Sequence, residues 1–259
     1  MLKLSRRIYL YLILLFLYLP IFVLIVFSFN DTKLRGVWAG FTTHWYTDLF
    51  EDPIILQAFY HTVIVALVAT VVATILGTIS AIGIHHLRRR SQKILLNVNY
   101  LPVLNPDIVT AVALMSLFGF LRIQQGLFTM ILAHIAFCMP YVILSVLPKL
   151  NQMNPNTVEA AYDLGATPFQ ALVQVVLPQL RAGIFSGALI AFTLSIDDFV
   201  ISFFTTGQGV SNLSIALYSM AKTGINPSMN ALSTIMFLSV LILLLLLNRK
   251  DIDLVDIEV

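Results

Sequence analysis

Three carboxylates stand in otherwise apolar stretches of the sequence, and they are the side chains whose type and position best suit chemistry. Asp197 and Asp198 are adjacent in "FTLSIDDFVISFFTTG", and Asp107 lies in "LNPDIV". A pair of carboxylates favours a cation, so we expect Asp197 and Asp198 to face a positively charged group. Asp107 has two open roles: it could face the same cation, or it could only stabilise a helix start. With Asn105 as N-cap and Pro106 at the first helical position, Asp107 would stand where a helix stabilises an anion without any ligand.

Enzymatic and metal chemistry find no support in the sequence motifs. The chain contains no G-x-x-x-x-G-K-[ST] phosphate loop, no H-E-x-x-H zinc motif and no G-x-S-x-G nucleophile motif. Its single cysteine, Cys138, excludes a disulfide framework and suits a small buried apolar position. His61 and His134 lie in apolar runs, where hydrogen bonding between helices is favoured over ligand binding or proton transfer. We expect no catalytic residue, no metal site and no cofactor.

Transmembrane helices are the elements that must position the carboxylates. Of the 259 residues 59% are hydrophobic and 11% charged, and the mean hydropathy is +0.91. Soluble domains carry about a quarter charged residues, so lipid is the solvent that fits this composition. Strand-like alternation is absent, which favours an all-α fold. About 20 apolar residues cross a bilayer, and this length predicts six spans: Ile8–Phe29, Ala58–Gly83, Ile94–Leu121, Leu127–Leu147, Ile184–Phe204 and Ser228–Leu247.

The third and fifth of these spans contain the carboxylates. Ile94–Leu121 is broken by "LPVLNPDIV", and such breaks are tolerated only where the backbone meets protein or a cavity. Counted from Ile184 at about 1.5 Å per residue, Asp197 lies roughly 20 Å into an apolar core of about 30 Å. A charge at that depth costs about 2.5–3.5 kcal/mol, so we expect it to face a wet cavity. The alternative is a pairing with a basic or hydroxyl group of another subunit.

The basic residues predict that both termini are cytoplasmic, because inner loops carry an excess of Lys and Arg. With the N-terminus inside, the eleven inner ones are Lys3, Arg6, Arg7, Arg88, Arg89, Arg90, Lys93, Lys149, Arg181, Arg249 and Lys250. The four outer ones are Lys33, Arg35, Arg122 and Lys222. The predicted boundaries are 1–57 for a retained anchor helix and outer segment, 58–248 for one transmembrane domain, and 249–259 for a cytoplasmic tail.

A capped helix-turn-helix is predicted on the inner side, in a loop at 151–182 that contains "NPNTVEAAYDLGATPFQALVQVVLP". Each of its two short helices has an N-cap followed by proline, a glycine ends the first helix, and a proline is expected to stop the second. These signals are, in chain order, Asn154, Pro155, Gly165, Thr167, Pro168 and Pro178. A loop that only links two spans is usually shorter and needs no caps of its own.

This elbow resembles the EAA motif of permease subunits of binding-protein-dependent ABC importers. E-A-A, three residues, G, nine residues, an aliphatic residue, one residue and L-P match this chain, with Val175 where isoleucine is commoner. The resemblance covers about Ala58 to Leu247 and implies a type I ABC importer permease fold with six helices. In that family the elbow docks on the ATP-binding subunit. The coupling residues that this implies are Glu159, Ala160, Ala161, Asp163 and Gly165.

Three further stretches, "NPDIV", "FTLSIDDFVIS" and "TTGQG", resemble the permeases of spermidine/putrescine importers, in particular the second of their two permease subunits. The resemblance implies a polyamine path lined by Asp197, Asp198 and Asp107 in a bacterial inner membrane. It also implies two ATP-binding subunits, a second permease subunit and a secreted polyamine-binding protein as partners. The alternatives are an ABC permease for another small solute and a proton-coupled secondary transporter, which would need no docking elbow.

Overall fold

A computed structural model of the chain describes residues 2–32, 37–224 and 227–255. Lys33, Arg35 and residues 256–259 of the tail lie outside the described residues. Throughout the described ranges the regular elements are helices, which confirms the all-α prediction. They form two compact units, one made of residues 1–57 and 216–259 and the other of residues 58–215.

Four described helices are long and apolar enough to cross a membrane, namely Tyr9–Phe27, Pro53–His85, Leu127–Gln152 and Pro168–Ile196. The helices α4 (Arg89–Leu104) and α5 (Asp107–Phe120) are bent by 105° at a short break between them. If the two are counted together as one broken span, they provide a fifth crossing. The described part of α12 (Pro227–Val255) contributes a shorter apolar helix, Pro227–Ile242. These helices are compatible with the six predicted spans.

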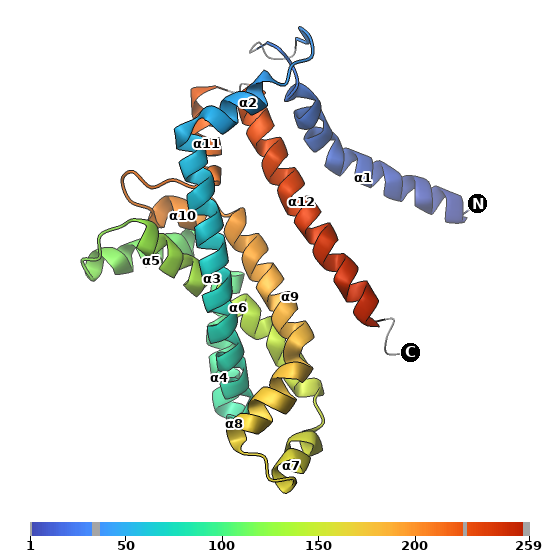
Figure 1. The fold of residues 1–259 in the computed structure, drawn as a ribbon, viewed down its shortest axis with the longest axis vertical. Coiled ribbons are helices and arrows are strands. Elements are labelled where there is room, and N and C mark those ends of the chain that lie inside the picture. The colour runs from blue at the N-terminus through green and yellow to red at the C-terminus, as the bar shows by residue number, and fades with distance from the viewer. Residues whose placement is uncertain (1, 33–36, 225–226, 256–259) are drawn as a thin grey trace. The chain divides into compact units, whose positions relative to one another are not determined.

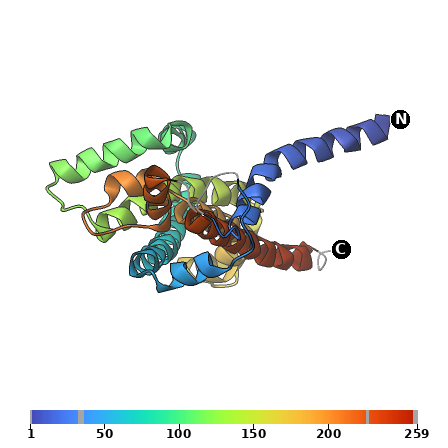
Figure 2. The ribbon, with the colours of Figure 1, turned by 90° about the horizontal axis from the view of Figure 1, so that it is seen from above.

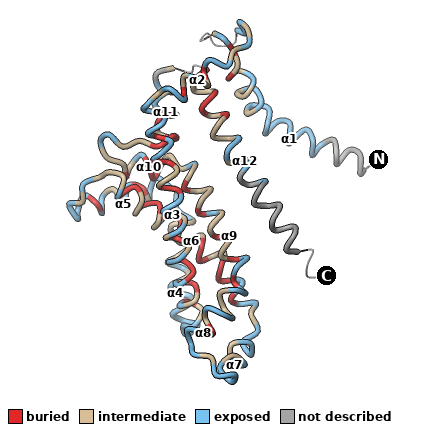
Figure 3. The backbone as a smooth tube through the Cα atoms, viewed as in Figure 1, coloured by how far each residue is buried: buried red, intermediate tan, exposed pale blue. Residues whose placement is uncertain are grey.

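The unit formed by residues 58–215 is built around α6 (Leu127–Gln152). Its neighbours include α3 (Pro53–His85) and α9 (Leu177–Ile196), and the buried residues gather along these helices (Figures 1 and 3). Core side chains on α6 include Phe137, Val142, Ile143 and Val146. Cys138 is also fully buried here, as its surroundings in the sequence predict.

Small residues bring α3 and α9 close to α6. A Cβ added at Gly183 would lie 2.9 Å from Lys149 Cγ, and one at Gly187 would lie 3.2 Å from Val142 Cα. On α3, a Cβ at Gly77 would lie 2.7 Å from Val142 Cβ. Membrane helices associate through such close contacts, because lipid gives little hydrophobic drive for one helix to bind another.

The short helix α10 (Val200–Thr205) and the first residues of α11 (Leu213–Thr223) complete this unit around the aspartate pair. The six-residue α10 packs on α6 and on α5, and α5 and α10 lie side by side in two perpendicular views (Figures 1 and 2). The chain then continues into α11, which leads to the second unit.

The unit formed by residues 1–57 and 216–259 contains α1 (Leu2–Phe27), α2 (His44–Glu51) and α12, with α12 in contact with both α1 and α2. Asn30 organises the segment between α1 and α2. Its side chain donates to Val37 O at 2.7 Å and accepts from the N–H of Ala39 at 3.0 Å, while Trp45 Nε1 donates to Asn30 O at 2.8 Å. The segment before α2 is therefore an ordered turn in its described part.

Candidate functional site

The elbow forms as its cap signals predict. Asn154 caps α7 (Pro155–Asp163) and accepts from the N–H of Asn156 at 3.0 Å. The helix ends in a Schellman turn, in which Gly165 has φ +87 and the N–H groups of Gly165 and Ala166 donate to the carbonyls of Tyr162 and Ala161. The second short helix is α8 (Pro168–Ala171), capped by Thr167 in a capping box with Gln170.

The prediction that Pro178 stops the second elbow helix is wrong. The chain passes from α8 through a π-helix, η1 (Leu172–Val176), directly into α9, so that Pro168–Ile196 is one continuous helical stretch. Pro178 is the second residue of α9 and directly follows η1, and a π-helical turn is a local adjustment that accommodates a proline inside a helical stretch. The second half of the elbow is therefore continuous with a helix long enough to span a membrane.

The residues expected to couple to a partner lie at the surface of the elbow, which forms one end of the 58–215 unit (Figures 1 and 3). Glu159, Ala160, Asp163 and Gly165 are exposed, and Ala161 is half-buried. Two large apolar side chains beside them were not predicted as part of this surface. Leu164 is 90% exposed and Phe169 is 73% exposed. Their signal in the sequence is that they stand in a segment otherwise rich in polar and small residues.

The aspartate pair lies at a break in a helix, which corrects the prediction that Ile184–Phe204 is one uninterrupted span. The helix α9 ends at Ile196, Asp197 is its C-cap, and α10 begins at Val200. Asp197 is exposed, whereas the Asp198 side chain is only 6% exposed. The two neighbouring carboxylates therefore have different surroundings.

The Asp198 carboxylate caps the short helix that follows it. One oxygen accepts from the N–H of Ile201 at 3.1 Å, and the other accepts from the N–H of Ser202 at 2.7 Å. These N–H groups have no partner inside α10, because the first turn of a helix leaves its donors free. Asp198 thus stabilises the start of α10.

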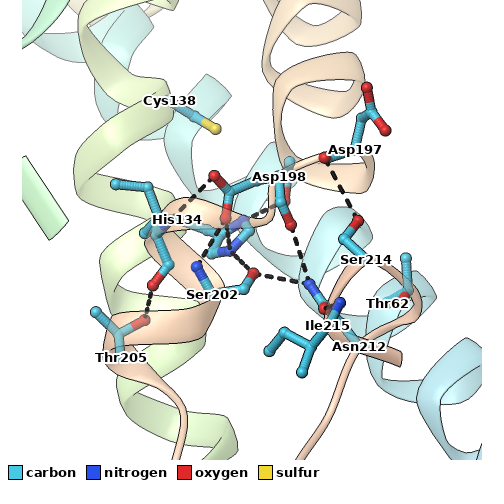
Figure 4. Close-up of polar contacts among 12 residues, drawn as sticks. Thr62, His134, Cys138, Asp197, Asp198, Ser202, Thr205, Asn212, Ser214 and Ile215 are labelled. Carbon is cyan, nitrogen blue, oxygen red and sulfur yellow. Dashed lines mark hydrogen bonds and ion pairs between the residues drawn. The ribbon is translucent and has the colours of Figure 1, made fainter. Parts of the chain in front are cut away.

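His134 on α6 joins the two sides of the break (Figure 4). Its side chain is 1% exposed, with Nδ1 2.7 Å from Ser195 Oγ and Nε2 2.9 Å from Ser202 Oγ. Nε2 also lies 3.5 Å from Asp198 Oδ2. The structure confirms that His134 makes hydrogen bonds between helices. The same prediction for His61 is not met, because its Nδ1 lies 2.9 Å from the carbonyl oxygen of Ser211, which belongs to the segment between α10 and α11.

The backbone of the pair is held by the segment that leads into α11. Asn212 Nδ2 donates to Asp198 O at 3.2 Å and to Ser202 Oγ at 2.8 Å, and Ser214 Oγ donates to Asp197 O at 3.4 Å. The Asp197 carboxylate points away from this network (Figure 4). It has no hydrogen bond or ion pair with any residue that the structure describes, so its charge faces outward from the network.

Asp107 is the first residue of α5 and is exposed. The predicted cap before it is wrong by one position, since Asn105 is the C-cap of α4 and Pro106 is the N-cap of α5, with no side-chain cap bond. Asp107 itself stands in the first helical turn, where the dipole favours an anion. None of the described contacts joins it to Asp197 or Asp198.

Apolar helices that cross a membrane, a capped elbow continuous with one of them, and a carboxylate exposed at a helix break are together typical of a transport subunit. The chain belongs to the family described as binding-protein-dependent transport system inner membrane component, whose model matches residues 73–249. This confirms the family indicated by the EAA motif. The family is one of multi-pass inner-membrane permeases.

Curated relatives are similar over most of the chain. It is 36% identical over 249 residues to the spermidine/putrescine transport system permease protein PotC of Haemophilus influenzae, covering 95% of this chain and 97% of that one. It is 37% identical over 226 residues to PotC of Escherichia coli K12, covering 87% and 86%. The putrescine transport system permease protein PotI of Escherichia coli K12 is 37% identical over 223 residues, covering 83% and 79%.

Solved structures of ABC transporters share the fold. A bacterial ABC transporter that imports the acidic polysaccharide alginate superposes with a TM-score of 0.79 at 11% identity, covering 96% of this chain and 95% of that one. The MetNI methionine ABC transporter superposes with a TM-score of 0.64 at 17% identity, covering 76% and 94%. The predicted ABC importer permease fold is therefore confirmed.

Proposed function

We propose that the chain forms, with a second permease subunit, the translocation path for spermidine or putrescine in an ATP-driven importer. Sequence identity of 36–37% to permeases named for these polyamines, over most of the chain, is the observation that carries the substrate class. The partners are two ATP-binding subunits, the second permease and a polyamine-binding protein outside the membrane. The fold alone does not select the substrate, because an alginate importer shares it.

The two aspartates of the pair have different roles in this proposal. Asp197 faces the path and stabilises the ammonium groups of the passing polyamine, since its exposed carboxylate has no partner among the described residues. Asp198 caps α10 and keeps the break in shape through Ile201 and Ser202. The main role of Asp107 is that of a favourable charge in the first turn of α5. Its contribution to the transport path is secondary.

The elbow is the docking site for an ATP-binding subunit. Its exposed apolar side chains, Leu164 and Phe169, lie on either side of Gly165 in the sequence and belong to the same elbow as Ala160 and Ala161. Because η1 continues into α9, and α9 ends at the aspartate pair, a displacement of the elbow reaches the path along one helical stretch. More basic residues lie in the loops on the elbow's side of the membrane than in the loops on the other side. This excess supports cytoplasmic termini and a cytoplasmic elbow.

Uptake of radiolabelled spermidine and putrescine by cells that lack other polyamine importers tests this function. Asp197→Asn keeps size and hydrogen bonding but removes the charge, and a hydrogen bond to a charged group contributes about 1.5–3 kcal/mol, so uptake should fall about 10- to 100-fold. The amount of assembled complex should stay the same. Asp198→Ala should instead lower the amount of complex, because two N–H groups lose their cap.

Asp107→Asn is the matched control, since an asparagine is tolerated at a helix start and its effect on uptake should be smaller. Normal polyamine uptake by the Asp197→Asn, Asp198→Asn double variant would contradict the assigned path. Wild-type uptake of uncharged solutes alone would contradict the polyamine assignment and leave the permease family standing.

A further inference from the structure

We propose that His134 is a positioning residue: it holds the break between α9 and α10 in the one geometry that directs the Asp197 carboxylate into the transport path. This inference rests on the proposed function of Asp197. His134 does not touch the polyamine, since its side chain is 1% exposed and both ring nitrogens are engaged by protein groups.

The geometry of the two serine contacts carries the proposal. Ser195 is in the last turn of α9 and Ser202 is near the start of α10. In a continuous helix the seven-residue step between them would separate the two by roughly 10.5 Å along the axis. One imidazole instead contacts both hydroxyls, at 2.7 and 2.9 Å. The ring therefore spans the break and fits only when the helix is interrupted between these serines.

The remaining contacts make His134 the link from α6 to the whole break. Ser202 Oγ also accepts from Asn212 Nδ2 at 2.8 Å, and Asn212 donates to Asp198 O as well. Asn212 is anchored in turn to α11, where its side-chain oxygen accepts from the N–H of Ile215 at 2.9 Å. The connection runs from α6 through Ser202 and Asn212 to the backbone beside Asp197 (Figure 4).

A neighbouring segment of α3 strengthens the same frame. Thr62 Oγ1 accepts from the N–H of Leu213 at 2.9 Å, and the His61 ring lies 2.9 Å from Ser211 O. Residues 211–213 are therefore fixed on one side by α3 and on the other by the break. Because α3 and α6 both hold this segment, the backbone at Asp197 has little conformational freedom. Removing His134 would release the restraint that α6 provides.

Two side-chain exchanges separate positioning from packing. His134→Leu replaces the imidazole with an apolar side chain of similar size and so removes both contacts. His134→Gln keeps one acceptor and one donor at the end of the side chain. The control is Cys138→Ala, one turn away on α6 and equally buried, whose thiol makes a single weak contact, 3.4 Å from Ala191 O.

The first measurement reads the geometry without any substrate. A spin label is placed on Asp197→Cys in the complete importer, with the native cysteine replaced by alanine, and its mobility is recorded in proteoliposomes. We expect an ordered label when His134 is present, a mobile label in His134→Leu, and recovery of at least half of the order in His134→Gln. A label equally ordered in the wild type and in His134→Leu would overturn the proposal.

The second measurement reads transport per assembled complex, as uptake of radiolabelled spermidine at saturating binding protein. We expect His134→Leu to lower uptake at least tenfold, His134→Gln to retain at least a third, and Cys138→Ala to stay within twofold of the wild type. In the Asp197→Asn background, His134→Leu should lower uptake no more than a further twofold, because the group that it positions has already lost its charge.

A further tenfold loss in the Asp197→Asn background would show that His134 acts independently of Asp197, and this would overturn the proposal. Equal losses of uptake in His134→Gln and His134→Leu would overturn it as well. If the wild type takes up no spermidine while the label at 197 still responds to His134, the polyamine function is refuted and the positioning role of His134 is supported.

Discussion

Truncating the two apolar side chains of the elbow is the perturbation whose size follows most directly from the structure. Leu164 is 90% exposed and Phe169 is 73% exposed. Fully burying a side chain of this kind contributes about 1.5–3 kcal/mol relative to leaving it in water. Scaled by these exposed fractions, the contribution to docking is about 1.5–2.5 kcal/mol for Leu164 and about 1–2 kcal/mol for Phe169.

These free energies convert directly to affinity, at about 1.4 kcal/mol for each factor of ten. Leu164→Ala should weaken binding of the ATP-binding subunit about 10- to 60-fold, and Phe169→Ala about 5- to 30-fold. The assay titrates purified ATP-binding subunit onto the permease pair in nanodiscs and measures the dissociation constant. Neither substitution should change the yield of the permease pair, because both side chains are exposed.

Phe120→Ala is the matched control, because Phe120 is of the same type, is 84% exposed, and lies at the end of α5 rather than on the elbow. It should leave the dissociation constant within twofold of the wild-type value. Unchanged affinity in both elbow variants would refute the docking role of these side chains, as would a loss in Phe120→Ala equal to that in Phe169→Ala.

Three further outcomes are expected. In a chain whose native cysteine is replaced by alanine, a cysteine at Gln170 should resist membrane-impermeant thiol reagents in intact cells and one at Thr42 should react; the reverse labelling would overturn the predicted orientation. Gly187→Val should lower the melting temperature of the purified complex, because a Cβ added there would lie 3.2 Å from the backbone of α6, whereas a Cβ added at Gly83 would have no atom within 4 Å and Gly83→Val should leave the melting temperature nearly unchanged. Gly165→Ala should weaken ATPase binding by straining a turn with φ +87, at about 1–2 kcal/mol, and equal binding would show that the elbow tolerates another turn.

The elbow was largely predictable because its signals are local. Asn154, Gly165 and Thr167 each act on backbone groups within a few residues, so their types fix the caps without knowledge of the rest of the fold. The continuation past Pro178 was not predictable in the same way. A π-helix just before it brings the chain into α9 with the proline in the first turn, and that arrangement depends on how α9 packs.

The break at the aspartate pair could not be read from apolar patterning. No glycine or proline stands between Ser195 and Ser202, and the whole stretch is apolar enough to continue as one helix. Asp198 precedes α10 and its carboxylate accepts from N–H groups of that helix, so the restart had a local signal. The break itself is held by His134, which lies 61 or more residues earlier in the chain, and by Asn212, which lies beyond α10. Contacts between distant segments decided the outcome, and they also gave the two aspartates different roles.

ATP-dependent uptake of radiolabelled spermidine into proteoliposomes is the most direct test of the proposed transport function. The liposomes would contain this chain, a second permease subunit and the ATP-binding subunits, with the polyamine-binding protein outside and ATP inside. We predict accumulation that requires ATP and all of these proteins, persists when the proton gradient is dissipated, and falls about 10- to 100-fold in Asp197→Asn. Uptake by this chain alone, driven by a proton gradient without ATP, would contradict it.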